Sequence, residues 1–80
     1  MKIVSLNKMK EVQYFGNTVH VPDNINFIGT DQNGTIMGFE KRPVVDHGFN
    51  FWDNPTADDM YEIGVMDLDG TDWTSTLQEV

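Results

Sequence analysis

The chain has 80 residues, no cysteine and a formal net charge of −8. We expect residues 1–80 to form one domain with a small core, without disulfides or thiolate metal sites, for which assembly into a homo-oligomer is one way to bury more apolar surface. The acidic balance argues against direct binding to nucleic acid or to an anionic membrane surface, because both need basic groups.

The amino-terminal segment predicts a cytoplasmic protein. Lys2 to Leu6 alternates weakly between polar and apolar residues and is a candidate edge strand, but it is too short for the apolar core of a secretory signal. No apolar run approaches the roughly 20 residues of a membrane span. The absence of cysteine suits a reducing compartment. We therefore expect a mature cytoplasmic chain without membrane contact.

A first hairpin is predicted around residues 16–17. Residues 14–15 and the β-branched stretch 18–21 flank this Gly-Asn pair, and the partner strand is expected in the segment before it. The sequence Val-Pro-Asp-Asn at 21–24 then predicts a turn that ends the hairpin, since proline fixes φ.

A second hairpin is predicted from residues 26–30 and 35–40. They flank Asp31-Gln32-Asn33-Gly34, in which Asn33-Gly34 can supply the positive φ angles of a hairpin connection. Apolar residues fall on both faces of this strand pair. We therefore expect the pair in the centre of a sheet, or covered on one face by a second chain.

The rest of the chain predicts one more strand and a helix. Pro43 ends the second hairpin, 44–50 is a loop, and 60–66 is the last strand, with Tyr61, Ile63 and Val65 on one face. After a turn at 67–70, a short helix over 73–79 would place Trp73 and Leu77 on the sheet. The predicted fold is α+β and mainly β: an antiparallel meander of four or five strands with a short C-terminal helix.

The negative charge is concentrated in the last third of the sequence. Residues 1–52 carry five bases and five acids, whereas residues 53–80 carry eight acids and no base. Such a region attracts basic protein surfaces, including grooves that hold nucleic acid, and it also favours solubility. We predict a partner-binding acidic surface made of Asp53, Asp58, Asp59, Glu62, Asp67, Asp69 and Asp72.

The spacing Asp67-x-Asp69-Gly70-x-Asp72 raises the question of a cation site. Three carboxylates suit a hard cation, but the glycine follows the second acid and no glutamate closes a calcium-binding loop. A turn followed by a helix N-cap explains the same residues, so we predict no metal and no cofactor.

Catalysis is not predicted. There are two histidines, His20 and His47, and the serine and threonine hydroxyls occur in no nucleophile elbow or triad context. Asp46-His47 is a sequence pair, but neighbouring side chains usually point apart, so a solvated loop histidine is expected. The glycines are scattered and form no phosphate-binding loop. We expect a binding protein and not an enzyme.

A cluster of aromatic residues follows the basic pair Lys41-Arg42. Phe49, Phe51 and Trp52 are residue types enriched at interfaces and in ligand pockets, although in a chain of this length they also build the core. Two alternatives therefore stay open for these five residues: an aromatic anchor or ligand pocket, or part of the core.

Motifs in residues 21–80 resemble a group of small uncharacterised proteins of tailed bacteriophages. The matching residues are Phe27-Ile28-Gly29-Thr30-Asp31, Gly34, Ile36, Phe39-Glu40 and Pro43, followed by Phe51-Trp52 and by Asp72-Trp73 and Leu77, with Thr76 where the group has serine. The resemblance implies an accessory protein that acts in the cytoplasm of an infected bacterial host by stoichiometric binding. It implies no particular target and no functional residues.

Three functional hypotheses follow. The first is a bacteriophage protein that binds and inhibits or redirects a host protein, for example in counter-defence, through an acidic surface that mimics nucleic acid. The second is an oligomeric sponge that sequesters a small anionic, nucleotide-like signal between the aromatic residues and Lys41-Arg42. The third is a minor virion or morphogenesis component.

Overall fold

The computed structural model describes residues 1–3, 8–56 and 58–80 of the chain. Within these ranges the protein is built from antiparallel strands and one 3-10 turn, so the mainly β prediction is confirmed; the predicted edge strand at residues 2–6 lies largely outside the described residues. The elements are β1 (Met9–Tyr14), β2 (Asn17–Pro22), β3 (Phe27–Thr30), β4 (Thr35–Phe39), β5 (Val44–Asp46), β6 (Phe51–Asp53), β7 (Met60–Val65), η1 (Trp73–Ser75) and β8 (Gln78–Glu79).

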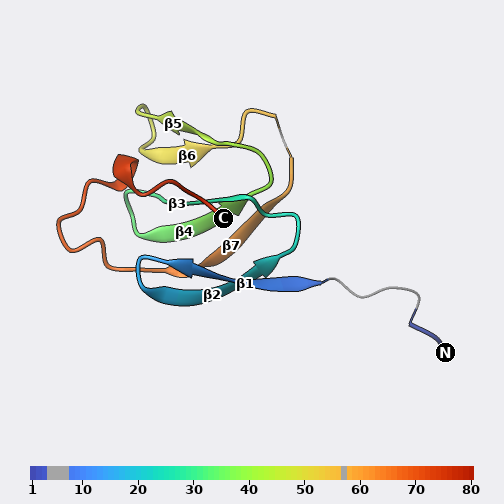
Figure 1. Ribbon diagram of the computed structural model, residues 1–80. Coiled ribbons are helices and arrows are strands. Elements are labelled where there is room, and N and C mark those ends of the chain that lie inside the picture. The colour runs from blue at the N-terminus through green and yellow to red at the C-terminus, as the bar shows by residue number, and fades with distance from the viewer. Residues whose placement is uncertain (4–7, 57) are drawn as a thin grey trace.

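The strands form a central four-stranded sheet and two hairpins. The sheet has the order β7-β4-β3-β8, and the hairpins are β1-β2 and β5-β6. Figure 1 shows the sheet between the β5-β6 hairpin above and the β1-β2 hairpin below. The predicted simple meander is wrong in strand order, because the β5-β6 hairpin is inserted between β4 and β7 and because β8 returns to pair with β3.

Each face of the sheet carries its own apolar core. The first core lies against the β1-β2 hairpin and consists of Tyr14, Val21, Ile25, Ile28 and Ile36. The second core, on the face towards the β5-β6 hairpin, consists of Phe39, Trp52 and Trp73, with Phe27 and Met37 partly buried beside them. The central position predicted for the β3-β4 pair is confirmed. Its two-sided apolar pattern is explained by hairpins of the same chain, without a second chain.

The turn between β3 and β4 depends on Gly34. Its φ is +92°, its N–H donates to the Asp31 carbonyl at 2.9 Å, and its own carbonyl accepts from the Met66 N–H at 2.8 Å. A Cβ at this position would collide with the Met66 carbonyl oxygen. Positive φ is required at Gly34 but not at Asn33, whose side chain instead accepts from the Thr35 N–H at 3.0 Å.

Strand β7 contains a bulge that changes which residues face the core. The β4-β7 register shifts between Ile36, which pairs with Gly64, and Met37, which pairs with Glu62. Ile63 packs against the first core, but Val65 is 76% exposed. The predicted common face for Tyr61, Ile63 and Val65 is therefore wrong at Val65, because the extra residue reverses the alternation beyond it.

The predicted C-terminal helix is not formed. Residues 73–75 make a 3-10 turn, and Gln78–Glu79 pair with β3 as strand β8. The Thr76 hydroxyl accepts from the Thr30 N–H at 2.9 Å, which holds the chain against the sheet where a helix would continue. The predicted contact of Trp73 and Leu77 with the sheet is confirmed, since both belong to the second core.

A buried hydrogen-bond network joins the two cores. The Tyr14 hydroxyl lies 2.7 Å from the Thr30 hydroxyl and donates to the Thr76 carbonyl at 3.1 Å. The Trp52 indole N–H donates to the Thr30 carbonyl at 3.0 Å. Burial raises the pKa of the Tyr14 hydroxyl, which keeps it protonated as a donor. The network therefore fixes the first hairpin, β3 and the C-terminal segment relative to one another.

Candidate functional site

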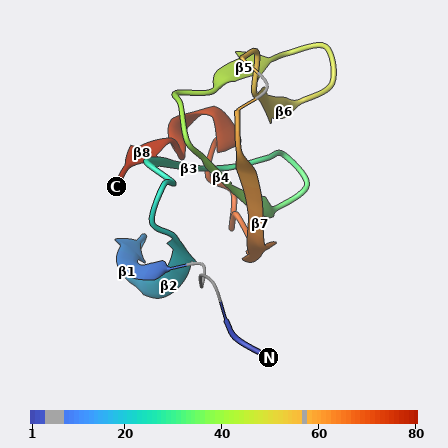
Figure 2. The same ribbon diagram turned by 90° about the vertical axis from the view of Figure 1, so that its right-hand side faces the viewer.

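Six of the seven predicted acidic residues lie on β7 or on the chain segments before and after it. Strand β7 is one of the two outer strands of the central sheet, as Figure 2 shows. A six-residue strand is about 20 Å long: Glu62 lies on β7, Asp58 and Asp59 come just before it, and Asp67 and Asp69 follow it. Asp72 lies farther along the chain, at the start of η1, which packs against β3. We call these six residues the acidic margin: Asp58, Asp59, Glu62, Asp67, Asp69 and Asp72. Asp53 ends β6 and belongs to a different layer.

The acidic margin has no compensating lysine or arginine among the described residues. In residues 1–3, 8–56 and 58–80 the one ion pair is between His20 and Glu11, at 3.5 Å, on the exposed side of the first hairpin. None of the five lysine and arginine side chains forms an ion pair with a carboxylate of the acidic margin in the described residues. Opposite charge must come from solvent or from a partner.

At the β7 start, two carboxylates meet at one amide. The Asn24 side-chain N–H₂ donates to Asp59 at 2.8 Å and to Glu40 at 3.2 Å, and the Glu40 N–H donates to the Asp59 carbonyl at 3.1 Å. Glu40 therefore joins the negative charge at this end. The sequence did not point to it, because its approach to Asp59 is created by the pairing of β4 with β7.

At the other end, the carboxylates hold turns. Asp67 accepts from the Asp69 N–H at 2.9 Å, and Asp72 is the N-cap of η1, accepting from the Thr74 N–H at 2.9 Å. Hydrogen bonds from the Thr74 hydroxyl and N–H hold the pKa of Asp72 below its usual value. Within the residues that the structure describes, no three His, Cys, Asp or Glu side chains are grouped to hold a metal ion.

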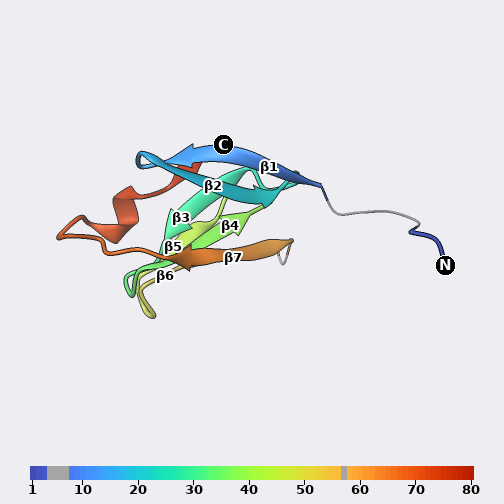
Figure 3. The same ribbon diagram turned by 90° about the horizontal axis from the view of Figure 1, so that it is seen from below.

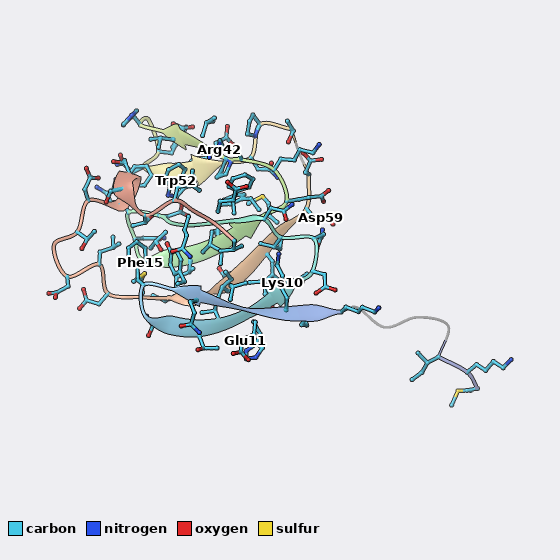
Figure 4. All side chains as sticks on the ribbon, in the orientation of Figure 1. Lys10, Glu11, Phe15, Arg42, Trp52 and Asp59 are labelled. Atoms are coloured by element: carbon cyan, nitrogen blue, oxygen red, sulfur yellow. The ribbon has the colours of Figure 1, made fainter. Side chains whose placement is uncertain are left out.

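Trp52, predicted as part of an aromatic anchor or ligand pocket, belongs to the core. Its side chain is 5% exposed, and its ring stands 6.0 Å from that of Trp73 at 84°. Figure 4 shows it between the hairpin β5-β6 and the rest of the fold. The indole lies so close to β3 that a Cβ at Gly29 would come within 2.9 Å of it. Trp52 is therefore not available to a partner.

The other four residues of that prediction, which are Phe49, Phe51, Lys41 and Arg42, lie in different environments. Phe49 is 82% exposed, and its ring is 6.4 Å from that of the half-buried Phe51. The Arg42 guanidinium lies 5.1 Å above the ring of Phe27, and Lys41 is exposed. The five residues are thus divided between core, surface and the contact with Phe27, and they do not form one binding pocket.

A cavity of about 210 Å³ lies between the β1-β2 turn and the loop after β7. Sequence reasoning predicted its lining residues Asp67 and Asp69 as partner-binding carboxylates, but it did not predict a cavity. Its lining is mostly apolar. Figure 3 shows that the β1-β2 turn and the loop after β7 lie at the same end of the molecule. The sequence does contain one signal, since Phe15 occupies a two-residue hairpin turn in which Asn, Asp or Gly is usual. The lining residues are Phe15, Met66, Asp67, Leu68, Asp69, Thr71 and Thr76.

The histidines lie apart from this cavity. His20 is opposite Glu11 in the β1-β2 register, and His47 belongs to the turn between β5 and β6. His47 makes a small contribution to the lowered pKa of Asp72. Among the described residues, His20 forms an ion pair with Glu11 and His47 forms none.

Asp31 fixes the β5-β6 hairpin to the sheet, and the effect of its charge on stability can be tested separately from its hydrogen bond. Its carboxylate accepts from the Trp52 N–H at 2.7 Å, and burial raises its pKa. A raised pKa means that its contribution to stability is complete below the unfolded-state pKa and is lost as pH rises through the folded-state pKa. We expect D31N, which keeps the acceptor without the charge, to raise the melting temperature at about pH 7 and not at about pH 3.

The control for this prediction is D31A. It leaves the Trp52 N–H without its acceptor and should lower the free energy of unfolding by about 1 kcal/mol at either pH. Thermal melts of the three proteins followed by circular dichroism measure both effects. A D31N protein that is less stable than the wild type at neutral pH would contradict the assignment.

The comparisons with known proteins leave the site to be interpreted from its own geometry. No protein-family model, no curated protein and no solved structure matches the chain. In the described part of the chain, no helix has the length and apolar character needed to cross a membrane.

Proposed function

We propose that this is an accessory protein of a bacteriophage that acts by binding a basic surface of a host protein and blocking or redirecting it. The observation that carries the proposal is the acidic margin, in which five carboxylates lie on β7 or close to its two ends and a sixth lies at the start of η1. None of them forms an ion pair with a lysine or arginine among the described residues. The motif resemblance to small bacteriophage proteins supports the biological setting.

The charge pattern favours a partner that normally holds nucleic acid. A row of carboxylates on the scale of about 20 Å offers a basic groove repeated negative charges, as a phosphate backbone does. Complementary charge raises the rate of association and selects against acidic partners. A bacterial enzyme or defence protein that binds DNA or RNA in a basic groove is therefore the expected target class.

Two observations remove the reasons for the hypothesis of an oligomeric sponge for a small anionic ligand. Both apolar faces of the β3-β4 pair are covered by the chain's own hairpins, and the aromatic and basic residues assigned to the ligand are separated. We therefore do not carry it further. A virion component is distinguished by the presence of the protein in purified particles.

A charge-matched pair of variants tests the proposal. D59N/E62Q/D67N/D69N removes four charges from the acidic margin, and E11Q/D23N/D46N/E79Q removes four from other elements; each changes the net charge from −8 to −4. The amides keep side-chain hydrogen-bond acceptors. The partner captured from host lysate by the wild-type protein is purified, and its binding is measured by calorimetry.

We expect the margin variant to bind at least about tenfold more weakly than the control variant, and wild-type binding to weaken between about 50 and 300 mM salt. Duplex DNA should compete with the protein for the partner. Equal affinity of the two variants, or binding that is insensitive to salt, would overturn the acidic margin as the docking surface.

A further inference from the structure

The cavity beside Phe15 is small and partly open to solvent. Its volume is about 210 Å³, below the range of about 300 to 1,000 Å³ that is typical of small-molecule sites. Met66, Leu68 and Phe15 supply its apolar wall. Figure 4 shows Phe15 at the opposite end of the molecule from Asp59. The cavity therefore lies at the Asp67–Asp69 end of the acidic margin, and not at the other end, where Asp59 contacts Asn24.

Phe15 adopts a conformation that bulky residues rarely adopt. Its φ is +47°, in a two-residue turn where Asn, Asp or Gly is favoured, and its side chain is still 54% exposed. The ring is oriented by an edge contact with Tyr14, with centroids 4.8 Å apart. A half-exposed aromatic ring held against a backbone preference is the kind of residue that is enriched at binding sites.

The rim of the cavity is negatively charged. Asp67 and Asp69 are exposed lining residues, and the described part of the chain places no lysine or arginine in an ion pair with either. An apolar floor with carboxylates at its rim complements an apolar side chain that has cationic neighbours.

We propose that this cavity receives a leucine-like or methionine-like side chain of the partner protein, flanked by lysine or arginine residues that face Asp67 and Asp69. The inference rests on the proposed function and adds to it the position and chemistry of the central contact. The acidic margin attracts the basic surface of the partner, and the cavity selects the segment of that surface which inserts.

The probe is a set of three pentapeptides added to the isotope-labelled protein and followed by amide chemical shifts in NMR spectra. The peptides are Lys-Lys-Leu-Lys-Lys, Lys-Lys-Ala-Lys-Lys and Glu-Glu-Leu-Glu-Glu. We expect the first to shift the amides of the cavity residues and to bind about tenfold more tightly than the second. The acidic peptide should cause no shift.

Two variants separate the apolar contact from the charges. F15N places a residue that tolerates positive φ in the turn, so it should fold and should raise the urea midpoint while abolishing the preference for leucine over alanine. D67N/D69N should weaken both cationic peptides and keep that preference. F49A, which removes an exposed ring outside the cavity, is the matched control and should bind as the wild type does.

The outcomes distinguish this inference from the proposed function. Equal binding of the leucine and alanine peptides, or shifts confined to the Asn24 end, overturns the cavity as a side-chain site but leaves the acidic margin as a docking surface. The absence of shifts with either cationic peptide counts against both. Shifts of the same amides on raising the protein concentration alone would assign the cavity to a second copy and overturn the inference.

Discussion

Replacing Trp52 with alanine is expected to leave the protein largely unfolded. The indole is buried between Gly29 and Trp73 and donates to the Thr30 carbonyl, so the variant loses an aromatic contact, a hydrogen bond and most of the second core. Truncation of a buried tryptophan costs about 3–5 kcal/mol. The net stability of a chain of this length is itself about 3–5 kcal/mol, so the variant would keep little free energy of unfolding.

Urea unfolding followed by far-ultraviolet circular dichroism measures this loss, with the fluorescence of Trp73 as a second probe. F49A is the control, because Phe49 comes from the same aromatic segment but is exposed, and surface substitutions usually change stability by less than about 0.5 kcal/mol. A W52A protein with the wild-type urea midpoint would refute the assignment of Trp52 to the core.

Replacing Thr76 with valine is expected to lower the free energy of unfolding by about 2 kcal/mol. Valine has nearly the same shape, but it leaves the buried Thr30 N–H without the acceptor that now stands 2.9 Å away. An unsatisfied buried donor costs about 1–3 kcal/mol. With a urea slope of about 1 kcal/mol per molar, the midpoint should fall by about 2 M.

T76S is the matched variant for this prediction. Serine keeps the hydroxyl and loses one methyl group, for which about 1 kcal/mol is the expected cost. T76S should therefore be clearly more stable than T76V in the same urea titration. The reverse order would mean that the side chain stabilises the protein through its methyl group and not through the Thr30 contact.

Local sequence signals predicted the strands and hairpins better than their assembly. The turns predicted at residues 16–17, 31–34 and 67–70 follow from glycine and its polar neighbours, and each is present, the first of them one residue earlier, at Phe15-Gly16. Strand order depends on contacts between distant residues. The spacing of Trp73 and Leu77 fits a helix, but it is met equally by a 3-10 turn followed by a strand, and the deciding contact joins Thr76 to Thr30, 46 positions apart.

The charge of the candidate site could be predicted from the sequence, but the packing of its aromatic side chains could not. The excess of acids after residue 52 is read directly from the sequence, and five of them fall on β7 or close to its ends, with Asp72 at η1. That they form one partner-binding surface stays a prediction. The sequence left Trp52 open as an anchor or as part of the core, and the structure places it in the core, where Gly29 leaves room for the indole above β3. The position of Phe15 beside a cavity could not be predicted, because the cavity exists only where the β1-β2 turn meets the loop after β7.

The bulge in β7 affects how copies of this protein behave at high concentration. An outer strand that is flat and uncharged can recruit an identical strand and start amyloid growth. Here Ile63 interrupts the regular pairing, and Glu62 with the acids at both ends of β7 would face the same carboxylates of an approaching copy. We expect repulsion along this edge to make the strand a poor seed for fibrils, so the carboxylates that we propose to recruit a basic partner would also keep the chain from polymerising with itself.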